Sequence, residues 1–110
     1  MMTKLLSRIK ANVDAELKEA RKNNGLYFNS SHEGFGVIAE ELEEAREEAS
    51  DTINSFEPMV RAIRKNDKGV LDNLLVSLEN HATLAACEFI QVAAMARKMR
   101  ESEEVKTNDR

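Results

Sequence analysis

The sequence has few of the residues that interrupt helices or cross-link chains. Its 110 residues include one proline, four glycines, one cysteine and no tryptophan. The single cysteine, Cys87, has no second cysteine to pair with, so an internal disulfide framework is excluded. This cysteine usage fits a reducing compartment, for which the cytosol is the default.

Long apolar runs and an excess of positive charge are also missing. No stretch approaches the roughly 20 apolar residues that span a bilayer, and the N-terminus lacks the pattern of a secretory or transit peptide. The 16 basic and 20 acidic residues give a net charge of −4, so no excess positive charge offsets a phosphate backbone. We therefore predict a cytoplasmic protein that binds neither membranes nor nucleic acid.

The residues that are abundant favour helix. Ala, Leu, Glu, Lys and Arg dominate, no segment is typical of a strand, and apolar residues recur three or four positions apart. This spacing predicts four helices, over residues 3–23, from Ser30 or Ser31 to about 58, over 59–65 and over 70–100. On the second helix the apolar positions form one stripe that we expect to be buried: Phe35, Ile38, Leu42, Ala45, Ala49, Ile53 and Phe56.

Local signals mark the ends of these helices. Asn24 and Gly25 supply a C-terminal stop, a serine hydroxyl can cap the second helix, and Pro58 should end or kink it. Residues 66–69 form a turn cluster before the last helix. The polar tail, 102–110, lacks apolar periodicity and is expected to fray or be disordered.

These elements predict one all-α domain over residues 1–101. We expect a helical bundle of three long helices plus a short one. A chain of this length buries a modest core, so we expect oligomerisation to complete the bundle.

The run from Glu40 to Glu48 is the most informative segment. A turn of 100° per residue places Glu41, Glu44 and Glu48 on one strip beside the apolar stripe. Oxygen ligands of this kind suit Mg²⁺, and nucleotide phosphates can complete its coordination shell. The alternative is a solvated helix face with local ion pairs, such as Glu43 with Arg46.

A second acidic residue stands in an apolar environment. Glu88 lies within residues 84–96, where every other residue except Gln91 is apolar or small. Burying a lone carboxylate is unfavourable unless it is paired or binds a metal. Glu88 and Gln91 share a helix face and could meet Glu41 and Glu44 across the bundle. An arginine, a subunit contact or solvent could satisfy Glu88 instead.

The two acidic patterns, Glu40-Glu41-x-x-Glu44 and Glu88-x-x-Gln91, resemble the paired motifs of MazG-like, all-α nucleotide pyrophosphohydrolases. The resemblance covers roughly residues 28 to 48 and 81 to 100 and is strongest to small, often phage-encoded members. It implies that Glu41, Glu44 and Glu88 hold Mg²⁺, with Mn²⁺ as an alternative. Glu40 would be a further ligand or would orient the attacking water. Gln91 stands where the family usually has an aspartate as fourth ligand.

The activity implied by this resemblance is hydrolysis of a nucleoside triphosphate. A canonical or modified (d)NTP and water would give (d)NMP and pyrophosphate, in the host cytoplasm if the chain is phage-encoded. The resemblance also implies a homo-oligomer, a dimer or tetramer. The alternative is a catalytically degenerate helical interaction module of the same fold, in which Gln91 marks loss of the metal site and the acidic face binds a basic partner.

Other polar and aromatic residues are weaker candidates. Six basic residues could contact phosphates, although solvated helix charge is the favoured interpretation: Arg61, Arg64, Lys65, Lys68, Arg97 and Lys98. His32 and His81 could each join a metal or phosphate site, but we interpret them as structural or exposed. Tyr27 and Phe28 are expected to pack rather than stack on a base, and Cys87 is expected to lie in the core.

Overall fold

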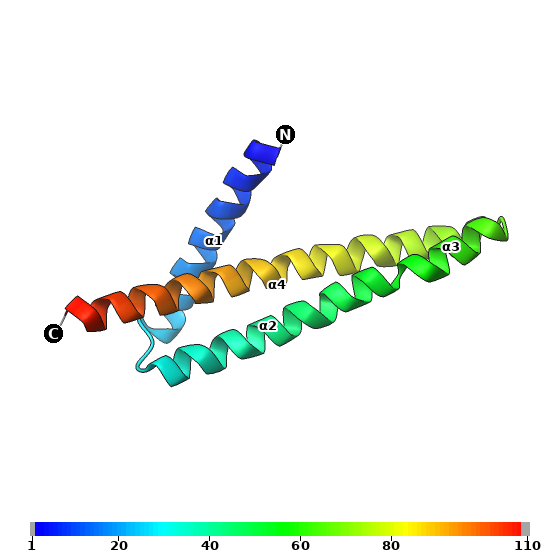
Figure 1. Cartoon of the computed structure of the whole chain (residues 1–110). Helices are drawn as coiled ribbons and strands as arrows, with labels where there is room; N and C mark the ends of the chain where they lie inside the picture. The colour runs from blue at the N-terminus through cyan, green and yellow to red at the C-terminus, as the bar shows by residue number, and fades with distance from the viewer. Residues whose placement is uncertain (1, 109–110) are drawn as a thin grey trace.

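The computed structural model describes residues 2–108 and contains four helices in that range, with no strand (Figure 1). They are α1 (Met2–Asn24), α2 (Ser31–Asn54), α3 (Phe56–Arg64) and α4 (Lys68–Asn108). The prediction of an all-α bundle of three long helices plus a short one is confirmed. None of these helices is long and apolar enough to cross a membrane.

The helices form an elongated hairpin with a crossing helix. The helices α2 and α3 run antiparallel to α4 and pack along its length (Figure 1). At its C-terminal end α1 packs on the C-terminal half of α4, while its N-terminal half projects away from the hairpin. The molecule measures 66 × 30 × 21 Å, so most residues lie close to its surface.

The first two helix boundaries follow the local signals of the sequence. Gly25 adopts a φ of 92°, a conformation that favours glycine, and its amide donates to the carbonyl of Arg21 at 3.0 Å. Ser30 caps α2, because its hydroxyl accepts a hydrogen bond from the amide of Glu33 at 3.1 Å.

The break between α2 and α3 comes earlier than predicted. Pro58 lies in the first turn of α3, which begins at Phe56. A proline ring clashes with the carbonyl four residues before it, which here is that of Asn54, the last residue of α2. The helix therefore ends before the proline instead of at it.

The turn before α4 is built from two polar residues. Asn66 has a φ of 53°, in the left-handed region that asparagine tolerates. The carboxylate of Asp67 accepts a hydrogen bond from the amide of Val70 at 3.1 Å. This cap lets α4 start at Lys68, two residues earlier than predicted.

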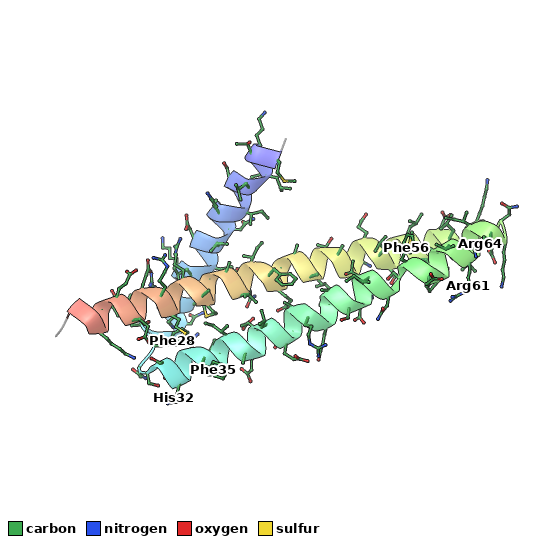
Figure 2. The ribbon with its side chains drawn as sticks, viewed as in Figure 1. Phe28, His32, Phe35, Phe56, Arg61 and Arg64 are labelled. Carbon is green, nitrogen blue, oxygen red and sulfur yellow. The ribbon has the colours of Figure 1, made fainter. Side chains whose placement is uncertain are left out.

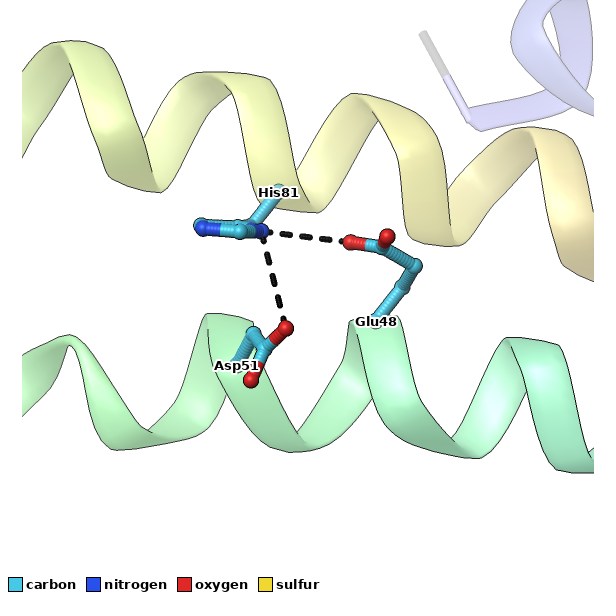
Figure 3. Close-up of side chains that lie close together, drawn as sticks. All are labelled: Glu48, Asp51 and His81. Carbon is cyan, nitrogen blue, oxygen red and sulfur yellow. Dashed lines mark hydrogen bonds and ion pairs between the residues drawn. The ribbon is translucent and has the colours of Figure 1, made fainter.

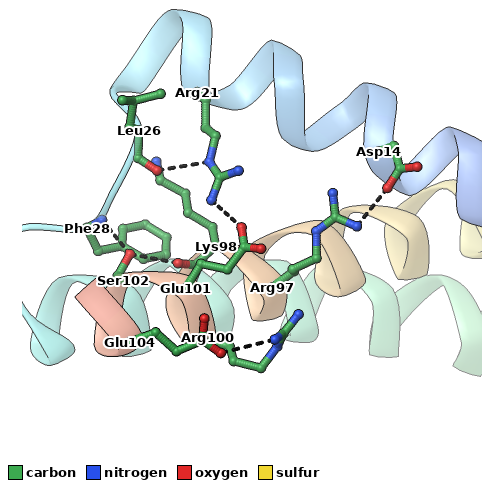
Figure 4. A network of polar contacts seen from close by, with 10 residues as sticks. All are labelled: Asp14, Arg21, Leu26, Phe28, Arg97, Lys98, Arg100, Glu101, Ser102 and Glu104. Carbon is green, nitrogen blue, oxygen red and sulfur yellow. Dashed lines mark hydrogen bonds and ion pairs between the residues drawn. The ribbon is translucent and has the colours of Figure 1, made fainter. Parts of the chain in front are cut away.

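The prediction of a disordered tail is wrong for residues 102–108, which continue α4. Ser102 is 2% exposed, and its hydroxyl accepts a hydrogen bond from the amide of Phe28 at 2.9 Å. Glu101 pairs with Arg21 of α1 at 2.6 Å (Figure 4). Polar contacts with the α1–α2 connector thus hold a segment that lacks apolar periodicity. The last two predicted tail residues lie outside the described range.

The buried core is small. Its apolar residues are Leu17, Phe28, Ala45, Ala62, Ala85 and Ala94. Of these, Leu17 is the one large side chain that is fully buried. A Cβ added at Gly34 would lie 3.1 Å from side-chain atoms of Met99 and Phe28, so glycine allows the start of α2 to approach α4 closely.

The apolar stripe predicted to be buried on α2 is mostly exposed. Ala45 is buried, whereas Phe35 is 69% and Leu42 49% exposed. The apolar segment of α4 is also only partly covered, with Phe89 48% exposed, and Cys87 is exposed rather than in the core. The reason is geometric, because α2 packs against one long helix and that helix covers only part of the stripe.

Candidate metal centre between α2 and α4

Three of the predicted acidic residues lie together in the structure. Glu41 and Glu44 come from neighbouring positions on the surface of α2, and Glu88 comes from α4. One oxygen from each carboxylate can be chosen so that the three lie within 4.8 Å of one another. Helical spacing places the two glutamates on one strip of α2, and the packing of α2 against α4 brings that strip opposite Glu88.

Two of these carboxylates have an oxygen that is both buried and unpartnered. Oε2 of Glu41 and Oε2 of Glu88 are shielded from solvent and have no hydrogen-bond partner. Buried polar atoms are normally satisfied, because leaving one without a partner carries a desolvation penalty. A cation between the carboxylates would satisfy both oxygens.

The electrostatic environment agrees with this geometry. Burial raises the pKa of Glu41, and the charges of Glu44, Glu88 and Glu40 raise it further. Burial likewise raises the pKa of Glu88, followed by the charge of Glu44, a side-chain hydrogen bond with Glu44 and the charge of Glu48. Each carboxylate resists ionisation next to the others, and a divalent cation would relieve that repulsion.

The remaining two predicted site residues lie at the margin of this group. Glu40 is exposed and does not belong to the three-carboxylate cluster, although its charge acts on Glu41. Gln91 is exposed and lines a pocket of about 170 Å³ together with Glu41. The structure thus keeps Gln91 on the same side of α4 as the cluster.

The crossing helix α1 contributes residues that the sequence analysis did not consider. Glu16 and Asn24 of α1 line the same small pocket as Glu41 and Gln91. Their spacing of eight residues, with Ala20 between them, places them on one face of α1. That spacing was visible in the sequence, but it did not indicate which helix this face would meet.

A second cluster lies beside the first. Nδ1 of His81 is 3.2 Å from Oε2 of Glu48 and 4.0 Å from Oδ2 of Asp51 (Figure 3). These contacts agree with a structural role for His81, although the sequence did not indicate its partners. Its position seven residues before Glu88 was the available signal, because residues seven apart share a helix face.

The two clusters form one continuous surface, which we call the acidic edge. Its members are Glu41, Glu44, Glu48 and Asp51 of α2 with His81 and Glu88 of α4. Seven residues advance an α-helix by roughly 10.5 Å, which sets the spacing between His81 and Glu88 along α4. The charge of Glu48 in the second cluster is one of the causes that raise the pKa of Glu88 in the first.

Four of the basic candidates lie far from the cluster of Glu41, Glu44 and Glu88. Arg61 and Arg64 lie at the α3–α4 end of the hairpin (Figure 2), and Lys65 and Lys68 flank the same turn. Arg61 follows Glu44 by 17 residues, a rise of roughly 25 Å along helices. These side chains are remote from the carboxylates.

The two basic candidates on α4 have structural contacts instead. Nη1 of Arg97 is 2.7 Å from Oδ1 of Asp14 on α1. Lys98 is 2% exposed, and its ammonium group lies 4.5 Å from the centroid of the Phe28 ring (Figure 4). Burial lowers the pKa of Lys98. Both residues fasten α4 to α1 and to the connector, and Lys98 is not the solvated charge that its sequence position indicates.

The arrangement offers hard oxygen ligands in a partly buried setting, which is the donor set that Mg²⁺ and Mn²⁺ prefer. Comparisons of the chain with protein-family models, with curated proteins and with solved structures find no match. A functional assignment therefore rests on the arrangement of the chain's own residues.

Proposed function

We propose that this chain is a Mg²⁺-dependent pyrophosphohydrolase that converts a nucleoside triphosphate and water into the monophosphate and pyrophosphate. One observation carries the proposal: Glu41, Glu44 and Glu88 gather within 4.8 Å, and Glu41 and Glu88 each have a buried oxygen without a partner. Carboxylate oxygens are the ligands that Mg²⁺ prefers, so the residues fit the ion. Mn²⁺, which accepts the same ligands, is the alternative.

Each residue of the site has a defined role in this proposal. Glu41, Glu44 and Glu88 would hold the cation. When bound, the cation neutralises phosphate charge and lowers the pKa of a nearby water. Glu40, exposed beside the cluster, accepts a hydrogen bond from the attacking water and orients it. Gln91 supplies a neutral amide at the margin of the site.

The charge balance of the site also limits how a nucleotide can bind. The acidic edge repels a free triphosphate, and the basic turn of the hairpin is remote from the cluster. A nucleotide would therefore bind together with the divalent cation that the carboxylates would hold. Affinity for the nucleotide should accordingly require the metal.

The test is a pyrophosphate-release assay over a panel of ordinary and modified (d)NTPs, with Mg²⁺, with Mn²⁺ and with chelator. We expect metal-dependent release that is lost in Glu88→Gln. The matched control is Glu79→Gln, because Glu79 is an exposed glutamate of the same helix outside the acidic edge. Equal turnover in the two variants would refute the assignment of the site.

The same assay separates the enzyme from an interaction module. If the folded wild-type protein released no pyrophosphate from any nucleotide of the panel, the non-catalytic interaction module would be favoured. The acidic edge of such a module would bind a basic partner. Binding of such a partner would persist with chelator present, whereas metal-dependent hydrolysis would not.

A further inference from the structure

The second cluster of the acidic edge contains a nitrogen donor as well as carboxylates. Glu48 and Asp51 lie three residues apart on α2, so both side chains are on one face of that helix. His81 approaches them from α4, and its ring nitrogen Nδ1 faces both carboxylates (Figure 3). The hydrolysis proposed above uses none of these three residues.

The spacing of the three donor atoms fits a metal ion. Ligands that lie about 2.1 Å from an ion are roughly 3.0 to 3.4 Å from one another in octahedral or tetrahedral geometry. Nδ1 of His81 is 3.2 Å from Oε2 of Glu48, and one donor atom from each residue can be chosen so that all three lie within 4.8 Å of one another. The side chain of Asp51 is 57% exposed, so its carboxylate can rotate towards the others without disturbing the core.

The charge of this cluster is unbalanced when the imidazole is neutral. Among the described residues, His81 is the only ion-pair partner of the carboxylates of Glu48 and Asp51. Neutral imidazole, which is the form that binds metals, brings no positive charge to them. A divalent cation would balance both carboxylates and would take the ring nitrogen as a ligand at the same time.

We propose that Glu48, Asp51 and His81 bind a divalent transition-metal ion, of which Zn²⁺ fits best. Imidazole and carboxylate together are common ligands of Zn²⁺, whereas Mg²⁺ prefers oxygen ligands alone. Three protein ligands leave at least one coordination position open to water or to a small anion. This site does not depend on the proposed enzymatic activity.

The distance between the two clusters makes them separate sites. His81 and Glu88 are spaced by roughly 10.5 Å along α4, whereas two ions that act on one phosphate lie about 3.5 to 4 Å apart. An ion at His81 would therefore not share a phosphate oxygen with an ion at Glu88. It would instead connect α4 to the C-terminal end of α2, close to the break before α3.

The test is calorimetric titration of the metal-free, full-length chain with ZnCl₂ in the presence of excess MgCl₂. We expect tight binding of one Zn²⁺ per chain. In His81→Gln the dissociation constant should rise by at least about 100-fold, because a lost ligand should cost more than the 10- to 100-fold typical of an outer-shell partner. Circular dichroism shows whether the variant is folded. Asp51→Asn, at an exposed position, should weaken binding in the same direction.

Two matched controls remove the other soft donors of the chain. His32→Gln removes the second histidine, which is exposed at the start of α2, and should bind Zn²⁺ as the wild type does. Cys87→Ser should do the same, because this exposed thiol lies roughly 120° around α4 from His81. Loss of tight binding in either control would overturn the assignment of the ligands.

A third variant separates this site from the proposed function. Glu88→Gln should lose metal-dependent pyrophosphate release and should still bind Zn²⁺ tightly, because Glu88 belongs to the other cluster. Tight Zn²⁺ binding without any pyrophosphate release by the wild type would support this site and refute the enzyme.

Nitrogen NMR of the wild type identifies the ligand atom without any variant. The chain has two histidines, so two imidazole rings are observed. Zn²⁺ should move the resonance of Nδ1 of His81 and leave the ring of His32 unchanged. A wild type that binds no Zn²⁺, a folded His81→Gln variant that binds it equally well, or a shift confined to His32 would each overturn the proposal.

Discussion

The two edges of the hairpin differ in what each presents to its surroundings. The acidic edge gathers carboxylates in partial burial, with unpartnered oxygens on Glu41 and Glu88. The apolar edge, which carries Phe35 and Leu42 of α2 and Phe89 of α4, leaves large side chains in water. In the proposed function only the acidic edge would hold a cation. We therefore expect the two sides of the α2–α4 pair to have different functions.

The largest difference should come from two substitutions at neighbouring positions. Glu41→Gln should lower metal-dependent pyrophosphate release by at least about 100-fold, because a proposed ligand of the cation is lost. Leu42→Ala, one position along α2, should leave release nearly unchanged, because Leu42 is not in the carboxylate cluster. Pyrophosphate release by both variants measures the difference. An equal loss in the two variants would show that the edges are not separate.

The second effect concerns stability in the presence of metal. Mg²⁺ at about 100 times its dissociation constant should stabilise the wild type by about 2.7 kcal/mol, because it binds the folded state alone. Thermal unfolding with MgCl₂, against NaCl at equal ionic strength, measures this difference. Glu88→Gln should lose the effect and Leu42→Glu should keep it. Equal midpoints in the two salts for the wild type would contradict a metal site on the acidic edge.

A smaller effect is expected at the margin of the site. Gln91→Asp adds a charged oxygen ligand next to Glu41, so the Mg²⁺ concentration for half-maximal activity should fall by about 10-fold. Gln91→Asn, which stays neutral, is the control and should not tighten binding. If both variants behave alike, position 91 does not contact the cation.

The smallest expected effect is a change in the pH dependence of stability without metal. The pKa values of Glu41 and Glu88 are raised in the folded protein, so the folded state holds these protons more tightly than the unfolded state. Their contribution is fully present below the ordinary pKa of 4.5 and is lost as the pH rises through the raised values. Chemical denaturation at several pH values should show a shallower fall for the double variant Glu41→Gln, Glu88→Gln. An unchanged profile would mean that these carboxylates titrate normally.

Much of the fold was predictable because capping residues and glycine determine where these helices start and stop. Ser30 caps α2 and Gly25 ends α1, both as the sequence indicates. The sequence also indicated that Glu88 could meet Glu41 and Glu44, because helical spacing puts the two glutamates on one strip and a bundle pairs the two long helices, but the register between the helices was not predictable.

The parts that could not be predicted depend on contacts between distant segments. The end of α4 is held by Ser102 and Glu101 through bonds to residues more than 70 positions away. The role of His81 depends on which residues of α2 it faces, and the exposure of Phe35 depends on how much of α2 one neighbouring helix covers. Periodicity identifies an apolar face, but it does not say whether the same chain covers that face.

Because α4 is one continuous helix, the number of residues between its functional positions determines which side of the helix each position faces. One residue inserted between His81 and Glu88 would turn everything beyond it by about 100° relative to what precedes it. Such an insertion would rotate one cluster away from α2 and would move Phe89 off the apolar edge. An insertion in the turn at Asn66 would leave both helices in phase. Insertions and deletions should therefore be tolerated at the turns of this chain but not within α4.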